Sequence, residues 1–330
     1  MKAAVLVQTN EPLVVADLEM PALGVGQVHV RVEFSAICGA QLGEIAGAKG
    51  PDKYLPHLLG HEGVGDVLAV GAGVRTKAIG DRVILHWRPS EGIAAQGAVY
   101  DWNGTPVNSG PMTCFSTETI VSENRLTKLP AGVDPRVAPL FGCALTTAYG
   151  VVVNDAKVKP GDAVLIYGVG GVGLPMVAMA RAAGASVIGV VDLVSWKVDA
   201  ALRAGATHDP SFDSEQFDVA IDTTGKSEAI EACYRRTKPQ GRVILVGVPK
   251  HDDPIRIDSL PLHFGKVLTG SQGGDCQPHT DTPRLAAMMR DGHLNFDGLV
   301  THEVTLEQIN DGLDLVRSGQ AGRVLVRMDT

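Results

Sequence analysis

Residues 163–180 read AVLIYGVGGVGLPMVAMA, and this stretch decides the fold. Eighteen residues without a charge could be taken for a membrane span, but four glycines and Pro175 argue against one continuous helix. We predict instead a buried strand over 163–167, a glycine turn, and a helix from about 172 to 183. Pro175 then falls in the first turn of that helix, where a missing N–H costs little.

The residues on both sides of this stretch continue the alternation of strand and helix. Further strands are expected at 186–191, 218–221 and 242–246, and helices at 196–204 and 227–236. The strands are apolar throughout and do not alternate in polarity. This pattern indicates an α/β fold with a parallel sheet covered by helices on both faces.

The first 140 residues follow a different pattern. Valine-rich runs at 28–32, 65–70 and 82–85 lie among many Gly and Pro turns, which predicts an irregular, mostly antiparallel β domain. The tail returns to short strands, with a helix near 306–318 and a last strand at 323–327. We therefore expect three segments, 1–144, 145–272 and 273–330, the last of which rejoins the first domain.

Composition limits the class of protein. A chain of 330 residues is long enough for two domains with ample core. A formal net charge of −8, without any basic run, disfavours nucleic acid and anionic membranes as partners. Five dispersed cysteines are too few for a disulfide scaffold, and the N-terminus has only weak features of a signal peptide. These features predict a cytoplasmic protein.

The glycine turn matches the dinucleotide fingerprint G-x-G-x-x-G, as Gly168-Val-Gly170-Gly171-Val172-Gly173. It follows a predicted strand and opens a helix, and Asp192 ends the next strand nineteen residues after Gly173. A pyrophosphate would then lie at the helix N-terminus. The Asp192 carboxylate can accept hydrogen bonds from ribose hydroxyls but would repel a 2′-phosphate, so we expect NAD(H) rather than NADP(H). The alternative is a glycine-rich turn without a ligand.

Two cysteines and one histidine are candidate metal ligands: Cys38, His61 and Cys143. A Cys-His-Cys set can hold a catalytic zinc ion and leave a fourth position open. The three are far apart in the sequence, so their spacing carries no metal-finger signature. Buried apolar thiols and a His-Glu surface turn remain as alternatives at this point.

Taken together, these elements resemble the zinc-dependent medium-chain alcohol dehydrogenase family over essentially the whole chain. The matching elements, in order, are MKAAV at 1–5, Cys38, GHEG at 60–63, VGAGV at 70–74, GDRV at 80–83, Gly142-Cys143, the glycine fingerprint and Ser318-Gly319. The resemblance implies a GroES-like, mostly-β catalytic domain, a Rossmann doubly wound parallel-sheet domain, and an active site in the cleft between them. It also implies a homo-oligomer, dimer or tetramer.

The resemblance assigns roles to individual residues. One catalytic zinc would be held by Cys38, His61 and Cys143, with Glu62 beside the metal. The cofactor-binding residues would be Thr147, Gly168, Gly170, Gly171, Val172, Gly173, Asp192, Lys197, Val246 and Arg323, of which Thr147 would contact nicotinamide and Arg323 the pyrophosphate. Trp87 would line the substrate pocket.

Departures from the family pattern matter as well. Residues 86–112 contain no cysteine, so a second, structural zinc is not expected. Ala40 stands where many relatives begin a proton relay with Ser or Thr, and it has no donor or acceptor. The proton must then leave through water, a substrate hydroxyl, or a histidine such as His57 or His86. Gln41 stands where relatives commonly place an aspartate that orients the histidine ligand.

The sequence thus predicts a zinc-dependent, NAD(H)-linked oxidoreductase that interconverts a small-molecule alcohol and its aldehyde or ketone. A polyol or sugar-derived alcohol is slightly preferred over ethanol, because polar residues such as Arg88 and Asp101 accompany Trp87. One alternative is an enoyl or quinone reductase on the same scaffold. Another is a non-catalytic NAD-binding protein, since fold alone does not guarantee activity.

Overall fold

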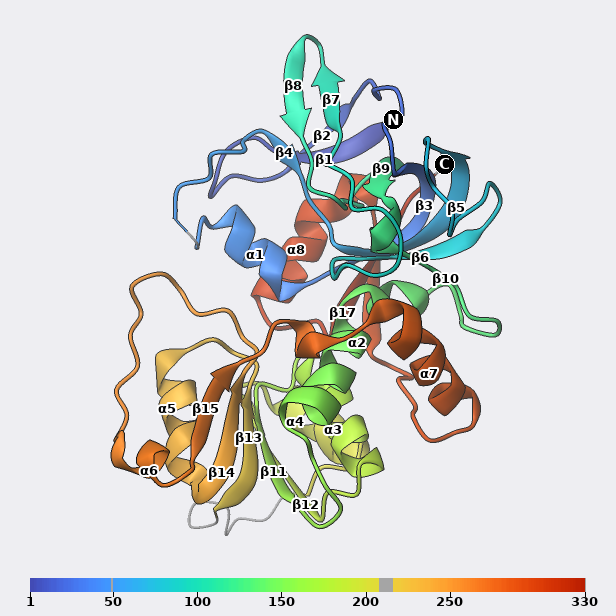
Figure 1. Cartoon of the computed structure of the whole chain (residues 1–330). Coiled ribbons are helices and arrows are strands. Elements are labelled where there is room, and N and C mark those ends of the chain that lie inside the picture. Colours follow the sequence, from blue (N-terminus) through green and yellow to red (C-terminus); the bar gives the residue numbers. More distant parts are fainter. Residues whose placement is uncertain (49, 208–215, 330) are drawn as a thin grey trace. The chain divides into compact units, whose positions relative to one another are not determined.

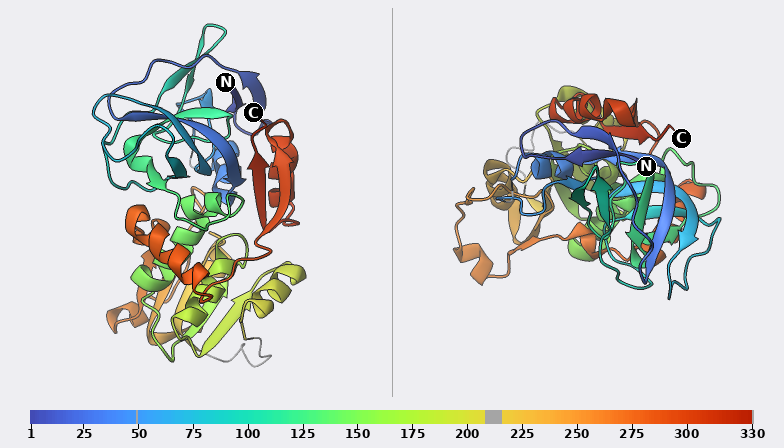
Figure 2. Two further views of the ribbon diagram at one scale, coloured as in Figure 1. Left: turned by 90° about the vertical axis from the view of Figure 1, so that its right-hand side faces the viewer. Right: turned by 90° about the horizontal axis from the view of Figure 1, so that it is seen from above.

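The computed structural model describes residues 1–48, 50–207 and 216–329. The chain forms two compact units (Figure 1). Unit 1 comprises Met1–Cys143, Gln277–Ala287 and Val300–Thr330, and unit 2 comprises Ala144–Cys276 and Met288–Leu299. Both chain ends therefore belong to unit 1 (Figure 2). No helix within the described residues has the length and apolar character needed to cross a membrane.

Unit 1 is built on two β-sheets. The smaller has the order β2-β1-β4-β8-β7, with β1 Lys2–Leu6, β2 Val14–Asp17, β4 His57–Leu58, β7 Val99–Trp102 and β8 Thr105–Asn108. The larger has the order β10-β6-β5-β3-β17-β16, with β9 also paired to β3. Its strands are β3 Gln27–Ile37, β5 Glu62–Val70, β6 Arg82–His86, β9 Glu118–Ser122, β10 Leu126–Lys128, β16 Val300–Thr305 and β17 Arg323–Arg327. Most pairs are antiparallel, as predicted.

Short helices accompany these sheets. They are α1 Gly39–Ile45, η1 Glu123–Arg125, η2 Ala138–Gly142, α7 Pro278–Arg290, η6 Leu306–Gln308 and α8 Ile309–Arg317. Helix α8 buries Ile309 and Leu313, four residues apart, in the same core cluster as the strand residues Ile37 and Val324. Strand β17 pairs with β3, and this pairing adds the end of the chain to the sheet formed by its beginning.

Unit 2 contains a five-stranded, wholly parallel sheet with the order β12-β11-β13-β14-β15. Its strands are β11 Ala163–Tyr167, β12 Val187–Val191, β13 Phe217–Asp222, β14 Thr237–Leu245 and β15 Val267–Gly270. Its helices are α2 Ala144–Gly150, η3 Val151–Asp155, α3 Gly173–Ala182, α4 Ser195–Arg203, α5 Ser227–Arg236, α6 Leu260–His263 and η5 Gly273–Asp275. The predicted α/β fold with a parallel sheet is confirmed.

The bounds of individual helices and strands agree with the predicted bounds to different degrees. Strand β11 and helix α5 have the predicted bounds, and α3 differs by one residue at each end. Strand β14 begins at Thr237, five residues earlier than predicted, because Thr237 pairs with Phe217 before an irregular register leads to the Val219–Arg242 pair. Helix α7 and strand β15 were not predicted.

The segment after β6 is held by packing and hydrogen bonds. It forms the antiparallel pair β7 and β8. Tyr100 is fully buried, and its hydroxyl accepts a hydrogen bond from the Ile120 N–H at 2.8 Å. Trp102 packs against the same apolar cluster.

Glu123 links three loop segments of unit 1 through a buried carboxylate that is 1% exposed. One oxygen accepts hydrogen bonds from the N–H groups of Arg75 and Thr76 and from the Thr76 hydroxyl, and the other accepts one from the Ile93 N–H, all at 2.7–2.8 Å. Burial alone would raise the pKa of Glu123. The hydrogen bonds outweigh burial and lower that pKa to about 2.

We therefore expect Glu123→Gln to destabilise unit 1 at neutral pH. The charged carboxylate stabilises the fold above the unfolded-state pKa of about 4.5, and this contribution of roughly 3 kcal/mol disappears as the pH falls towards 2. Urea unfolding should show that the free energy of unfolding falls more between pH 7 and pH 3 in the wild-type protein than in the variant. The exposed Glu11→Gln is the matched control. Equal pH dependence in wild type and Glu123→Gln would contradict this account.

Candidate functional site

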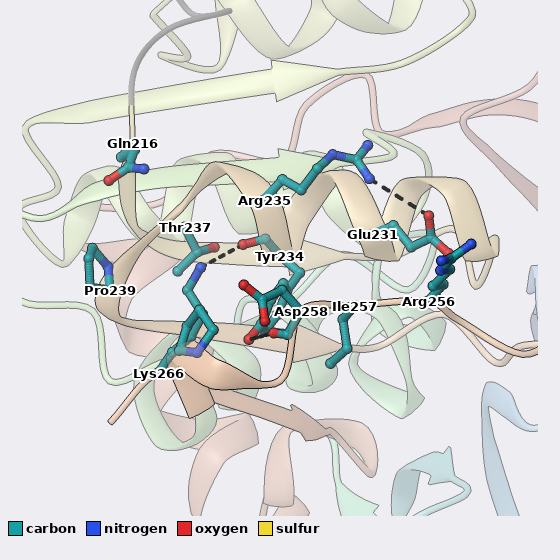
Figure 3. Close-up of a pocket in the computed structure, with 11 residues that line it drawn as sticks. Gln216, Glu231, Tyr234, Arg235, Thr237, Pro239, Arg256, Ile257, Asp258 and Lys266 are labelled. Atoms are coloured by element: carbon teal, nitrogen blue, oxygen red, sulfur yellow. Dashed lines mark hydrogen bonds and ion pairs between the residues drawn. The ribbon is translucent and has the colours of Figure 1, made fainter. Parts of the chain in front are cut away.

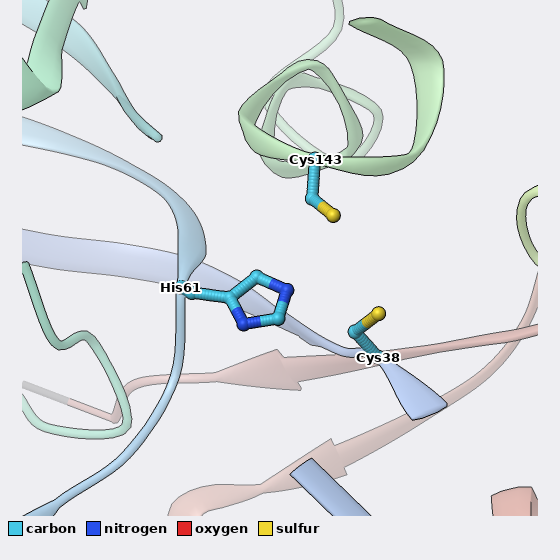
Figure 4. Close-up of side chains that lie close together, drawn as sticks. All are labelled: Cys38, His61 and Cys143. Atoms are coloured by element: carbon cyan, nitrogen blue, oxygen red, sulfur yellow. The ribbon is translucent and has the colours of Figure 1, made fainter. Parts of the chain in front are cut away.

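The three candidate metal ligands converge in unit 1 (Figure 4). Cys38 follows β3, His61 precedes β5 and Cys143 follows η2. Their ligand atoms all lie within 4.8 Å of one another. Both cysteines are buried, and His61 is partly buried.

Strand pairing explains why distant residues meet here. Strands β3 and β5 are antiparallel with Ser35 opposite Gly63, so the end of β3 lies beside the beginning of β5. Strand β6 pairs with the other edge of β5, and Trp87 directly follows β6. The Trp87 N–H donates to the Gly142 carbonyl at 3.4 Å. A Cβ at Gly142 would overlap the Leu85 carbonyl oxygen. Only glycine permits this approach, which places Cys143 next to the other two ligands.

The electrostatics of the cluster suit a soft cation. A hydrogen bond with Cys143 lowers the pKa of the Cys38 thiol well below its ordinary value, and His61 lowers it further, against the opposing effect of burial. The His61 Nε2 atom is buried without a hydrogen-bond partner. Two sulfurs and one unpartnered imidazole nitrogen fit zinc, with a fourth position left for another ligand.

The glycine fingerprint lies in unit 2 between β11 and α3. Gly168 adopts φ +83°, and a Cβ at Gly173 would overlap the Gly168 carbonyl oxygen, so the turn and the helix start both require glycine. A Cβ at Gly170 would meet no atom within 4 Å. Gly171 completes the turn, and Val172 is the N-cap of α3. The turn therefore leaves open backbone before a helix N-terminus, which fits a pyrophosphate.

Asp192 follows β12 and is tied to this turn. Its Oδ2 accepts the Val169 N–H at 2.9 Å, and its Oδ1 accepts the Val194 N–H at 3.0 Å. Each carboxylate oxygen can still accept a further hydrogen bond. The carboxylate is therefore held in place with acceptor capacity left for a ribose.

The other residues expected to bind the cofactor in unit 2 are Thr147, Lys197 and Val246. The Thr147 hydroxyl on α2 is buried without a hydrogen-bond partner, which fits a group contacted by a ligand. Lys197 on α4 lies with its ammonium 5.7 Å from the Trp196 ring centroid. Val246 follows β14, and its N–H donates to the Asp222 carbonyl at 2.8 Å.

Sequence reasoning did not single out Asp222 and Thr223, which support the glycine turn. Asp222 is fully buried, and its carboxylate accepts the N–H groups of Thr224 and Gly225 at 3.0 and 2.9 Å. The Thr223 hydroxyl donates to the Gly168 carbonyl at 2.7 Å. The signal was Asp-Thr-Thr-Gly at 222–225, a turn sequence directly after a buried strand.

Comparison with known proteins shows the family to which this chain belongs. The model of the zinc-binding dehydrogenase family matches residues 171–291, and that of the alcohol dehydrogenase GroES-like domain matches residues 24–131. Alcohol dehydrogenase B of Mycobacterium tuberculosis is 32% identical over 99% of this chain and 98% of its own length. The chain belongs to the zinc-dependent medium-chain alcohol dehydrogenase family.

Two further relatives are similar over almost their whole length. Alcohol dehydrogenase class-3 of Cereibacter sphaeroides is 30% identical, with 98% of this chain and 99% of that protein covered. The crystal structure of an alcohol dehydrogenase zinc-binding domain protein from Burkholderia ambifaria has a TM-score of 0.91 at 28% identity, with 100% and 99% covered. The protein is therefore an alcohol oxidoreductase with a GroES-like and an NAD-binding domain.

Glu62 and Arg323 form a buried ion pair in unit 1 of this alcohol dehydrogenase. Glu62 directly follows the ligand His61, and Arg323 begins β17. The pair places a balanced charge beside the metal ligands. The Arg323 Nε atom is buried without a hydrogen-bond partner, and its contact with pyrophosphate stays a prediction.

Trp87, expected in the substrate pocket, directly follows β6. Its carbonyl accepts a hydrogen bond from Arg125, and the Arg88 guanidinium lies 5.8 Å from the centroid of its ring. The first contact holds the backbone of Trp87, and the second places a cation beside its indole ring.

His86 and His57 are both engaged within the fold. Burial lowers the pKa of His86 to about 4, so this ring is neutral at pH 7. Its Nδ1–H donates to the Arg88 carbonyl at 2.7 Å, and its Nε2 lies 3.0 Å from the Thr127 hydroxyl. The His57 ring nitrogens lie 3.0 Å from the Leu58 carbonyl and 2.9 Å from an Asp52 carboxylate oxygen. Neither histidine offers an open ring nitrogen for proton transfer.

Gln41 connects two of the ligands and is fully buried. Its Oε1 accepts the Cys38 N–H at 2.8 Å, and its amide nitrogen lies 2.6 Å from the His61 Nδ1. An amide nitrogen can only donate, so this arrangement suits a histidine that carries its proton on Nε2. Zinc binding through Nε2 needs the other tautomer, in which Nδ1–H donates.

We predict that Gln41→Glu binds zinc about tenfold more tightly. Its two carboxylate oxygens can accept from the Cys38 N–H and the His61 Nδ1–H together, which leaves the Nε2 lone pair for the metal. Competition with a colorimetric chelator measures this affinity. The exposed Gln8→Glu controls for net charge. Unchanged affinity in Gln41→Glu would refute the interpretation.

Proposed function

We propose that this alcohol dehydrogenase interconverts an alcohol and its aldehyde or ketone with NAD(H), using one zinc ion bound by Cys38, His61 and Cys143. The approach of these three ligand atoms to within 4.8 Å carries the proposal. When bound, zinc acts as a Lewis acid that polarises the substrate oxygen and lowers the pKa of the alcohol. The two thiolates offset the charge of the metal, and the Glu62–Arg323 pair lies next to them.

The nucleotide-binding residues would orient the cofactor that accepts or donates the hydride. The open backbone at Gly170 and the N-terminus of α3 would bind the pyrophosphate. Asp192 and Lys197 would hold the adenosine ribose. The unpartnered Thr147 hydroxyl would contact the nicotinamide, and Val246 would line the cofactor site.

Proton transfer would proceed through water or a substrate hydroxyl. Ala40 has no polar side chain, and the ring nitrogens of His57 and His86 are engaged. A substrate with a second hydroxyl could carry the proton itself, which supports a polyol or sugar-derived alcohol. Trp87 would narrow the substrate pocket.

We also propose that the protein is a cytoplasmic homo-oligomer, a dimer or a tetramer. Strand β15 is at the edge of the unit 2 sheet, and an exposed strand edge invites pairing with another chain. Exposed apolar side chains lie on or near this edge: Val248, Leu260, Phe264 and Val267. The five free cysteines, all buried, support a reducing compartment.

Zinc content and turnover test the reaction together. We expect about one zinc ion per chain and NADH formation on alcohols, with polyols oxidised faster than ethanol. Cys143→Ser should lose both zinc and turnover, whereas the buried Cys233→Ser should retain both. Enone reduction without zinc would instead establish an enoyl or quinone reductase, and NADH binding without turnover a non-catalytic protein.

Cofactor choice depends on the charge of Asp192. Asp192→Asn keeps the shape of the side chain but removes the repulsion of a 2′-phosphate. We expect the ratio of kcat/KM for NAD to that for NADP to fall at least about tenfold, or ~1.4 kcal/mol. Asp199→Asn, an exposed substitution on α4, controls for net charge. Wild-type preference for NADP(H) would overturn the assignment.

A further inference from the structure

A cavity of about 400 Å³ lies in unit 2 (Figure 3). Its lining includes Thr237 at the start of β14 and Lys266 directly before β15. The glycine turn follows the other end of the parallel sheet, after β11. The cavity therefore lies at the edge of the sheet that the proposed function does not use.

Lys266 is the unusual residue of this cavity, because its ammonium is buried with only 7% of the residue exposed. The ammonium donates one hydrogen bond, to the Tyr234 carbonyl at 2.7 Å, and lies 4.4 Å from the centroid of the Tyr234 ring. No carboxylate of the described residues forms an ion pair with it. An ammonium has three N–H donors, so two remain for another partner. Burying such a charge is costly unless it is paired.

The rest of the lining adds positive charge. The Arg256 guanidinium forms no ion pair within the part of the chain that the structure describes, and Arg235 reaches Glu231 only at 3.7 Å. The cavity's two carboxylates already accept backbone N–H groups. Glu231 accepts that of Arg256 at 2.7 Å, and Asp258 accepts that of Leu260 at 3.0 Å. Three cations thus share the cavity with two carboxylates, each of which already accepts one backbone N–H, in a chain with a net charge of −8.

We propose that this cavity binds the phosphate group of a small phosphomonoester metabolite. Lys266 and Arg256 would contact the phosphate, whose oxygens can accept the two ammonium N–H groups that the Tyr234 carbonyl leaves open. A volume of about 400 Å³ exceeds that of a phosphate alone and lies within the range of small-molecule sites. The organic part of the ligand would lie against Ile257 and Pro261, which also line the cavity.

Calorimetric titration of the full chain with glycerol 3-phosphate, without alcohol or nucleotide, tests the proposal. We expect binding that weakens with added salt, no binding of glycerol, and at least a tenfold higher Kd in Lys266→Met and in Arg256→Met. The exposed Lys250→Met is the matched control and should bind as wild type does. This measurement does not depend on zinc or turnover, so it can fail while the dehydrogenase assignment stands.

Two results would overturn the proposal. One is the absence of glycerol 3-phosphate binding to the wild type at millimolar concentration. The other is a Kd unchanged in Arg256→Met but raised in Lys197→Met, which would place the anion at the nucleotide site. Because Arg256 is exposed, its variant decides the question even where Lys266→Met fails to fold.

Discussion

The pairing of strand β5 with β3 on one side and β6 on the other holds the metal ligands of this protein together. Side chains alternate between the faces of a sheet, so a slip of one residue in either pair would turn the strand residues to the opposite face. It would also displace Cys38 and His61, which adjoin the ends of β3 and β5. The close approach of Gly142 to the Leu85 carbonyl adds a further condition, because any side chain there would push Cys143 away. The zinc site thus depends on sheet register more than on the ligand residues' own loops.

Charge at this site is balanced by several buried groups. The neighbouring Cys143 favours the thiolate of Cys38, and Glu62 is neutralised by Arg323. Gln41 does not favour zinc binding, because its amide nitrogen faces the Nδ1 atom of His61, which must donate a hydrogen bond when zinc is bound. Ala40, in the adjacent position, has no polar side chain that could donate or accept a proton.

Sequence predicted the parts of the fold that depend on local patterns. The apolar run 163–167, the glycines after it and the helix 227–236 are each recognisable within one short window. Strand β15 has four mostly exposed residues and no apolar run, so it could not be recognised. Strand β14 begins in the polar stretch Thr237–Gly241, so its start could not be recognised either. The metal ligands could be nominated by residue type and by resemblance. Their meeting depends on pairing between segments up to a hundred residues apart, which no local pattern encodes.

X-ray absorption at the zinc edge of the purified protein tests the central claim most directly. The account predicts four-coordinate zinc with two sulfur neighbours at about 2.3 Å and nitrogen or oxygen neighbours at about 2.0–2.1 Å. Cys143→Ser should show no such spectrum, because this variant is expected to lose the zinc ion. A spectrum with only oxygen and nitrogen neighbours, or with four sulfurs, would contradict it.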